Sequence, residues 1–276
     1  MNAPIVTLTT DWGTRDFFVA LVKGRLCSLI PDVKIIDISH SQIWKDSAAT
    51  IGIIRNGLTS FPDGSVHIVD VGCECKQADG KPLLKITTPL AVHWRGQYII
   101  CSERRLLEQS FDGDCDEVVE LPLSRTAESY SFLANDMYCG VAQKIIAGTP
   151  LQQIGEACEP LRCRLQPPAQ TDGDRLVAMV TSIDSYGNAN LNITYREFES
   201  FRADRHFRVK IEWRVGSSDR FDDITGISKH YNDVRMGNVL LTVSSTGQLQ
   251  IAINKGSAAQ LIGLGFASKC HFIFES

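Results

Sequence analysis

The chain has 276 residues, which favours two domains over one, because a single core becomes hard to extend beyond about 250 residues. Hydrophobic residues make up 43% of it and charged residues 22%, so the composition is that of a folded globular protein rather than a disordered chain. The formal net charge is -4 and no basic cluster runs along the sequence, which argues against nucleic acid as a partner.

Membrane association and disulfides are also not expected. No stretch reaches the ~20 apolar residues of a membrane span, and the amino terminus has no charged segment followed by a long apolar run. The nine cysteines are odd in number and scattered, unlike a disulfide framework. Cys73 and Cys75 form a C-x-C, but no second closely spaced Cys/His pair completes a zinc site. We therefore expect a cytoplasmic protein with reduced thiols and no bound metal.

The first seventy residues alternate between strand-like and helix-like periods. The pattern predicts a strand at 5–10, a helix at 16–30, a strand at 33–39, a helix at 45–61 and a strand at 65–70. That βαβαβ order is typical of a parallel sheet. Further strands are predicted within 83–94, 97–101 and 117–122, and a further helix at 129–147.

A change of character follows at residues 162–175, where paired prolines and an Asp-Gly turn break all periodicity. We place the domain boundary there, giving an N-terminal α/β domain with a mostly parallel sheet (1–165) and a second domain (166–276). The second half consists of short, β-branched, turn-bounded runs, which predict an all-β sandwich or barrel.

Polar side chains lie at the carboxyl end of each of the first three predicted strands. The first strand ends in Thr9, Thr10 and Asp11, the second in Ser39 and His40, and the third in Asp70. Because ligands bind outside the carboxyl ends of parallel strands, these residues predict a site along that edge. Asp11 could hold a vicinal diol, or it could cap the helix that begins near residue 16.

Two common types of site are not indicated. No GxGxxG or Walker A sequence is present to hold a polyphosphate, and no GxSxG marks a serine hydrolase. His67 and His93 lie within strand-like runs, so we expect histidines whose hydrogen bonds are satisfied rather than ligands.

The stretch IDSYGNANLNI, residues 183–193, carries more polar groups than a hairpin turn needs. Asp184, Tyr186 and Asn188 lie at its centre, between two apolar runs. From the residues alone, the stretch is either a turn or part of a ligand site.

Several motifs, in order along the chain, resemble one family: TLTTDWGTRD, IIDISH, VHIVDVG, IDSYGNANLNI and SSTGQLQIAINKGSAA. It is the S-adenosylmethionine hydroxide adenosyltransferase family, which is related to the fluorinase and chlorinase enzymes. The resemblance runs over nearly the whole chain. It implies an N-terminal α/β domain, a C-terminal β-barrel domain, and a homotrimer whose active sites lie between adjacent subunits.

The resemblance also implies roles for individual residues. Asp70 matches the aspartate that activates water in the hydrolytic relatives, and Asp11 is assigned to the ribose hydroxyls. The segment with Asp184, Tyr186 and Asn188 is assigned to the methionine and adenine parts of the substrate, S-adenosylmethionine, and Ser245 to its methionine end. Trp12 and Trp44 are further substrate-binding residues. No metal or organic cofactor is implied, because the sulfonium of the substrate is itself a good leaving group.

The sequence departs from the family at the other two catalytic positions. Gln77 stands at the family's arginine, with Lys76 adjacent, and Leu133 stands at the family's histidine. Ala134 stands at the fluorinase serine, which disfavours fluoride. We therefore assign catalysis to Asp70, helped by Lys76 and Asn135. The alternatives are a non-catalytic sensor or scaffold for an adenosyl ligand, a chlorinase, and a vestigial site.

Overall fold

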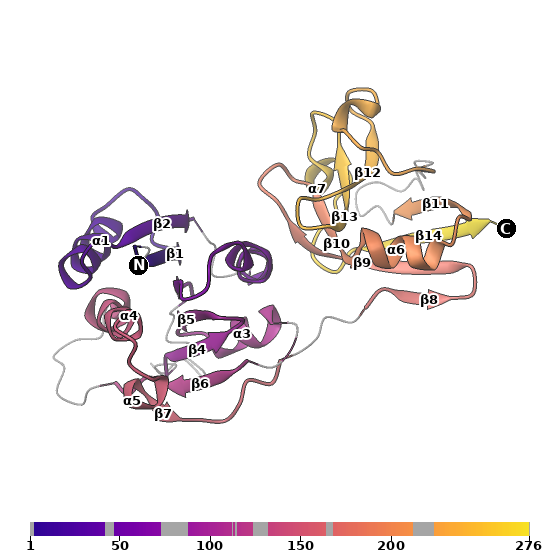
Figure 1. The fold of residues 1–276 in the computed structure, drawn as a ribbon. Coiled ribbons are helices and arrows are strands. Elements are labelled where there is room, and N and C mark those ends of the chain that lie inside the picture. Colours follow the sequence, from indigo (N-terminus) through magenta and orange to yellow (C-terminus); the bar gives the residue numbers. More distant parts are fainter. Residues whose placement is uncertain are drawn as a thin grey trace, which may run out of the picture. The chain divides into compact units, whose positions relative to one another are not determined.

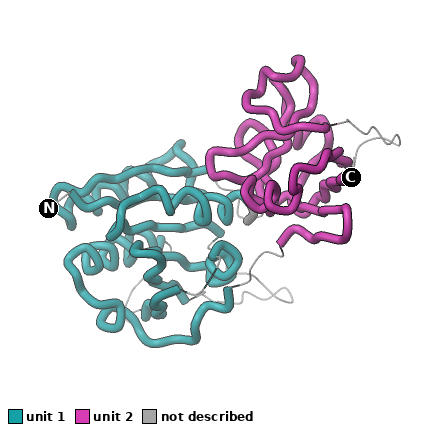
Figure 2. Tube along the Cα trace, turned by 45° about the vertical axis from the view of Figure 1, so that its right-hand side comes forward, with its two compact units in different colours: residues 1–164 teal, residues 165–276 magenta. Residues whose placement is uncertain are grey.

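The chain folds into two compact units, Met1–Arg164 and Leu165–Ser276 (Figure 2). The computed structural model describes residues 3–41, 47–72, 88–111, 113, 115–123, 132–163, 168–211 and 224–275. Across those residues, no helix is long and apolar enough to cross a membrane.

The first unit is built on a mixed sheet. Its described strands are β1 (Ile5–Thr10), β2 (Lys34–Ser39), β3 (Val66–Asp70), β4 (Leu90–Trp94), β5 (Gln97–Cys101), β6 (Glu117–Glu120) and β7 (Glu156–Ala157). They lie in the order β2-β1-β3-β5-β4-β6-β7 (Figure 1). The β2-β1-β3-β5 part is parallel, as the βαβαβ pattern predicts. The rest is antiparallel and begins with a two-residue hairpin, in which Arg95 and Gly96 both have positive φ.

Helices cover both faces of this sheet. They are α1 (Phe18–Leu29), α2 (Ser47–Gly52), the π-helix η1 (Ile53–Gly57), the 3-10 helix η2 (Leu58–Ser60), α3 (Arg104–Ser110), the π-helix η3 (Ala134–Tyr138), α4 (Cys139–Ile146) and α5 (Leu151–Ile154). Side chains of α1, η3 and α4 pack with Val6, Leu8 and Ile68. Those of α2, η1 and α3 pack with Val69 and Val92. Because successive strand residues point to opposite faces, Asp70 points to the same face as Ile68, the face of α1 and η3.

The second unit is an antiparallel sheet with short helices on it (Figure 1). Its described strands are β8 (Gln170–Asp172), β9 (Arg175–Ile183), β10 (Ala189–Thr194), β11 (His206–Ile211), β12 (Val239–Val243), β13 (Gln248–Ile253) and β14 (Lys269–Glu275). Their order is β11-β14-β9-β10-β13-β12, with β8 paired to β9. The helices are α6 (Tyr195–Arg202), η4 (Tyr231–Asp233) and α7 (Ala258–Leu261).

This sheet curls, but the predicted closed barrel is wrong for the part of the chain that is described. The two outermost strands, β11 and β12, are not paired with each other there. The stretch at 224–228 instead makes one isolated bridge to each strand, Ile224 to Val209 and Ile227 to Leu241. Single bridges do not form a ladder of backbone hydrogen bonds, so the sheet stays open between its outer strands.

Candidate functional site

The predicted polar edge exists in the first unit, at the carboxyl ends of β1, β2 and β3. Thr10 lies opposite Asp70 in the parallel register of β1 and β3. The Thr10 hydroxyl lies 2.8 Å from His40 Nδ1, so the ends of β1 and β2 are joined as well. The structure therefore brings together residues that follow three different strands, as the sequence predicts for this edge.

Asp70 is the last residue of β3 and is only 5% exposed. Its Oδ2 accepts a hydrogen bond of 2.9 Å from the indole Nε1–H of Trp12. A buried carboxylate needs donors to replace its lost hydration, and the indole supplies one. This is a carboxylate held in one orientation at the ligand-binding edge of an α/β sheet.

Asp11 lies in the turn after β1 and is exposed. Its Oδ2 accepts from the backbone N–H of Gly72 at 3.0 Å, which ties the end of β1 to the end of β3. The alternative that Asp11 caps the first helix is wrong, because the N-cap of α1 is Phe17 and the nearby backbone donor of Phe18 goes to Asp16. A carboxylate has about four acceptor positions, so Asp11 retains capacity for a ligand.

Trp12 is held by rings on two sides. Phe132 packs edge-on against it, with ring centroids 4.9 Å apart and planes at 73°. His40 stacks along it with centroids 6.2 Å apart and planes at 21°. The indole is half-buried in this arrangement, and its N–H direction is therefore set by packing.

His40 is in turn fixed from β2. Its Nε2 lies 3.1 Å from Asp37 Oδ1, and Lys23 Nζ on α1 lies 2.5 Å from Asp37 Oδ2. Burial acts to raise the pKa of Asp37, but the hydrogen bond from Lys23 and the neighbouring His40 outweigh it and hold the pKa below its ordinary value of 3.8. Asp37 is thus an ionised neighbour of the imidazole.

Of the other two residues assigned to catalysis, the structure describes Asn135 but not Lys76. Asn135 lies in η3, which packs beside β3, and its Nδ2 donates to Asp136 Oδ1 at 2.8 Å. Leu133, which the resemblance sets at the family's histidine, is a buried member of the apolar cluster under the sheet. Lys76, Gln77 and Trp44 lie outside the described residues, as does the Cys73 and Cys75 pair.

In the second unit, the loop between β9 and β10 is built around Asp184. Its Oδ1 accepts from the backbone N–H groups of Tyr186 and Asn188, both at 2.9 Å. Its Oδ2 accepts from Asn188 Nδ2 at 2.9 Å and from Gln250 Nε2 at 3.3 Å. These four bonds use the acceptor capacity of one carboxylate, so Asp184 shapes the loop.

The same loop also exposes an aromatic side chain. Tyr186 is 79% exposed, whereas Asn188 is 4% exposed. Tyr231, in η4, donates its hydroxyl to Gln250 Oε1 at 3.0 Å. Burial, together with the nearby Asp184 and Tyr186, raises the pKa of Tyr231. The loop is therefore both a turn and an exposed aromatic surface.

Gln250 and Tyr231 are part of this arrangement, although no motif in the sequence points to them. Gln250 lies opposite Asn190 in the β10–β13 register, and its Nε2 lies 3.0 Å from Asn190 Oδ1. Their pairing depends on which strands are neighbours. The polar Gln250 within the apolar run QLQIAIN was the one local signal.

Ser245 lies apart from that loop within the second unit. It is exposed in the turn between β12 and β13, where Gly247 O accepts from Tyr195 N, beyond the end of β10. The loop of Asp184 instead precedes the other end of β10, where Ala189 pairs with Ile251. Ser245 thus lies before the first residue of β13, whereas Asp184 contacts Gln250 within that strand.

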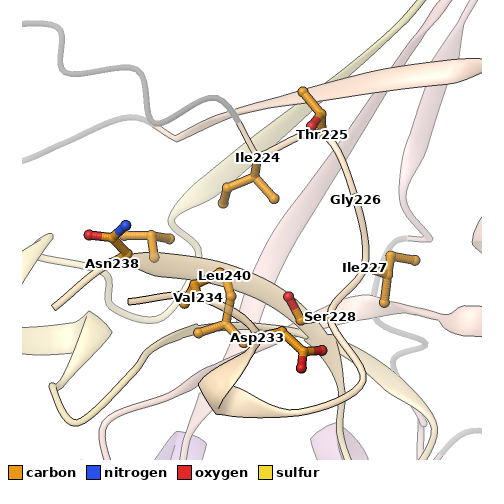
Figure 3. A pocket seen from close by; sticks show the side chains of 10 residues that line it. Ile224, Thr225, Gly226, Ile227, Ser228, Asp233, Val234, Asn238 and Leu240 are labelled. Atoms are coloured by element: carbon orange, nitrogen blue, oxygen red, sulfur yellow. The ribbon is translucent and has the colours of Figure 1, made fainter. Parts of the chain in front are cut away.

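A separate hollow of about 520 Å³ is present in the second unit (Figure 3). Its described lining comes from residues 224–228, 233–234 and 238–240 and includes none of the residues assigned from the sequence. The Asp233 carboxylate in it accepts from the backbone N–H groups of Lys229 and His230 at 2.9 and 3.0 Å. Throughout the described chain, no three His, Cys, Asp or Glu side chains are gathered to hold a metal ion.

The protein thus consists of an α/β unit with a polar edge at its parallel strands, followed by an antiparallel β unit with a polar aromatic loop. Both features are of the kind that small molecules occupy. Family models for the N-terminal and C-terminal domains of SAM hydroxide adenosyltransferases match residues 6–155 and 178–271. The chain belongs to the SAM hydroxide adenosyltransferase family.

Individual relatives cover nearly the whole chain. An (R)-S-adenosyl-L-methionine hydrolase of Salinispora tropica is 27% identical, with 95% of this chain and 94% of the relative covered. A fluorinase of Actinoplanes sp. is 23% identical, with 93% of each chain covered. In structure, an uncharacterized conserved protein from Thermotoga maritima matches with a TM-score of 0.75 and 20% identity, over 98% of this chain and 99% of the other. That last likeness concerns the fold alone.

Proposed function

We propose that the protein hydrolyses S-adenosylmethionine to adenosine and methionine. The observation that carries the proposal is the buried Asp70 carboxylate, fixed by Trp12 at the carboxyl edge of the sheet. Membership of the family and the hydrolase names of relatives such as that of Salinispora tropica support it.

The reaction is a displacement at C5′ of the ribose. A water oxygen forms a bond to C5′ while the C5′–S bond breaks, and its electron pair returns to sulfur, so methionine leaves as a neutral thioether. One proton of the water is released, which balances the positive charge of the sulfonium. Because the leaving group is good, the protein mainly has to hold one water in line with the C5′–S bond and keep other water away from C5′. Asp70 accepts a hydrogen bond from that water and orients it.

Other residues then hold the substrate or support the water. Asp11 accepts from the ribose hydroxyls, and Tyr186 offers its exposed face to the purine. The family resemblance also assigns Trp12, Trp44, Asn188 and Ser245 to substrate binding, whereas Asp184 acts only through the loop that it shapes. Lys76 and Asn135 assist Asp70 in place of the family's arginine and histidine. No metal or organic cofactor takes part in this scheme.

We also propose a homotrimer with its sites between adjacent subunits, as the family resemblance implies. Light scattering of the purified protein tests the trimer. The proposal also places the protein in the cytoplasm.

The test is a chromatographic assay of the protein with S-adenosylmethionine, with and without chloride, resolving adenosine, methionine and 5′-chloro-5′-deoxyadenosine. We expect adenosine and methionine in equal amounts. Asp70→Asn is expected to abolish turnover while ligand affinity stays nearly unchanged, since the amide cannot act as the anionic acceptor.

Asp11→Ala is the matched comparison, because Asp11 lies at the same edge but is assigned to binding. We expect it to weaken affinity by about tenfold or more in calorimetry, since two ribose hydroxyls lose a charged acceptor. Unchanged turnover in Asp70→Asn contradicts the proposed role of that carboxylate. Binding with no product after long incubation favours a sensor, and chlorinated product favours a chlorinase.

A further inference from the structure

The single polar atom of the Trp12 side chain is committed to Asp70. An indole Nε1–H is a donor only, and here it donates to Asp70 Oδ2 at 2.9 Å across 58 positions of sequence. Charge-assisted hydrogen bonds of this kind are stronger than neutral ones. The contact therefore restricts the rotation of the buried carboxylate.

The ring itself is poorly placed to serve a ligand as well. His40 stacks along it, and Phe132 packs edge-on against it. Phe132 also contacts Phe18 of α1, with centroids 5.0 Å apart, so the indole belongs to a continuous aromatic contact with the core helix. A side chain held from these directions keeps its N–H aimed at a fixed point.

A second bond reinforces the same junction. Asp11, adjacent to Trp12, accepts from the N–H of Gly72, two residues beyond Asp70. Asp11 and Trp12, two consecutive residues of the turn after β1, thus form hydrogen bonds to Gly72 and Asp70 at the end of β3. The carboxylate orientation is fixed by the turn of a neighbouring strand.

We propose that Trp12 is a positioning residue for Asp70, and that its indole N–H fixes the carboxylate against which the attacking water is placed. This rests on the proposed function, in which Asp70 orients water. It replaces substrate binding as the role of Trp12. The ring contributes through its donor rather than through its aromatic face.

The test compares kcat and KM for S-adenosylmethionine in the full-length protein and in Trp12→Phe and Trp12→Leu. Both substitutions remove the donor, but only Phe keeps an aromatic face. We expect both to lower kcat by about tenfold or more, the effect of one hydrogen bond to a charged group, with KM changed less than twofold. Trp94→Phe is the control, because Trp94 is in the same unit but stacks on Phe111, and its kcat is expected to match the wild type. Melting temperatures check that each variant is folded.

A second measurement does not depend on turnover. In ¹⁵N-labelled protein the indole N–H signal of Trp12, assigned by its loss in Trp12→Phe, is expected to move in Asp70→Ala. An unmoved indole signal overturns the inference while hydrolysis stands. The same holds if kcat is unchanged in both variants and KM is raised in Trp12→Leu but not in Trp12→Phe, because the aromatic face would then be what matters. Absence of turnover in the wild type, with the indole signal moving as expected, overturns the proposed function and with it the role of the contact.

Discussion

His67 provides a titration of stability that can be worked out from its contacts. It is fully buried in β3, where its Nδ1 lies 2.7 Å from the Thr7 hydroxyl and its Nε2 lies 2.9 Å from Gln97 Oε1. Gln97 donates its own amide to Phe61 O at 2.6 Å, so its oxygen must be the acceptor toward the ring. The neutral imidazole therefore carries its proton on Nε2, and its Nδ1 accepts from Thr7.

Burial lowers the pKa of His67 from 6.5 to about 4, although the hydrogen bond to Gln97 acts in the other direction. Between pH 4 and pH 6.5, His67 binds a proton in the unfolded chain but not in the folded one. Its contribution to the free energy of unfolding is therefore fully present above pH 6.5 and is lost as the pH falls toward 4. A shift of this size corresponds to about 3 kcal/mol in total, and about 2 kcal/mol of it is lost by pH 5.

The measurement is urea unfolding at pH 7 and pH 5 of the protein and of His67→Gln, whose amide bonds to the same neighbours but does not titrate. A Trp213→Phe background leaves tryptophans only in the first unit, so fluorescence reports on that unit. We expect the protein to lose about 2 kcal/mol more than His67→Gln between the two pH values, because other titrating groups cancel in the difference. Equal losses refute the reasoning.

Two further predictions concern the second unit. Gly187 has φ of +82° and an added Cβ would lie 2.0 Å from Ser257 Oγ, whereas Gly237 has φ of +83° and open space around it. Gly237→Ala is expected to cost roughly 1–2 kcal/mol from backbone strain alone, and Gly187→Ala more, with weaker adenosyl-ligand binding; equal costs in urea titrations contradict the clash. The Thr194 side chain caps α6 in a capping box with Glu197, so Thr194→Ala is expected to cost about 1 kcal/mol and Thr194→Ser much less. Similar losses in both Thr194 variants speak against the hydroxyl as the cap.

The sequence predicts the elements whose signals are local. The helix predicted at 16–30 is α1 (Phe18–Leu29), and the strand predicted at 33–39 is β2 (Lys34–Ser39). The helix predicted at 45–61 is described from Ser47 as α2, η1 and η2, with a π-helical turn at its centre. Apolar spacing indicates a helix but does not distinguish i+4 from i+5 bonding. The closure of a barrel likewise depends on long-range strand pairing, and there the prediction failed.

The candidate site divides in the same way. The sequence predicts that Asp11 and Asp70 lie at one edge, because the ends of parallel strands meet there. It does not predict the bond from Trp12 to Asp70, since both are half or fully buried side chains whose directions are set by packing. The contact between Gln250 and Asp184, 66 positions apart, is unpredictable for the same reason. Strand order locates residues, and packing decides which atoms meet.

The loop at 184–188 shows why polar density alone does not separate a turn from a ligand site. The Asp184 carboxylate accepts hydrogen bonds from the backbone of Tyr186 and Asn188 and from the side chains of Asn188 and Gln250. That internal bonding orders the loop before any ligand arrives, so binding does not have to supply the ordering free energy. The exposed ring of Tyr186 is then presented from a preformed support. A loop of this kind serves a ligand through the rigidity that its buried polar groups provide, and the Asp184 carboxylate contributes without touching the ligand.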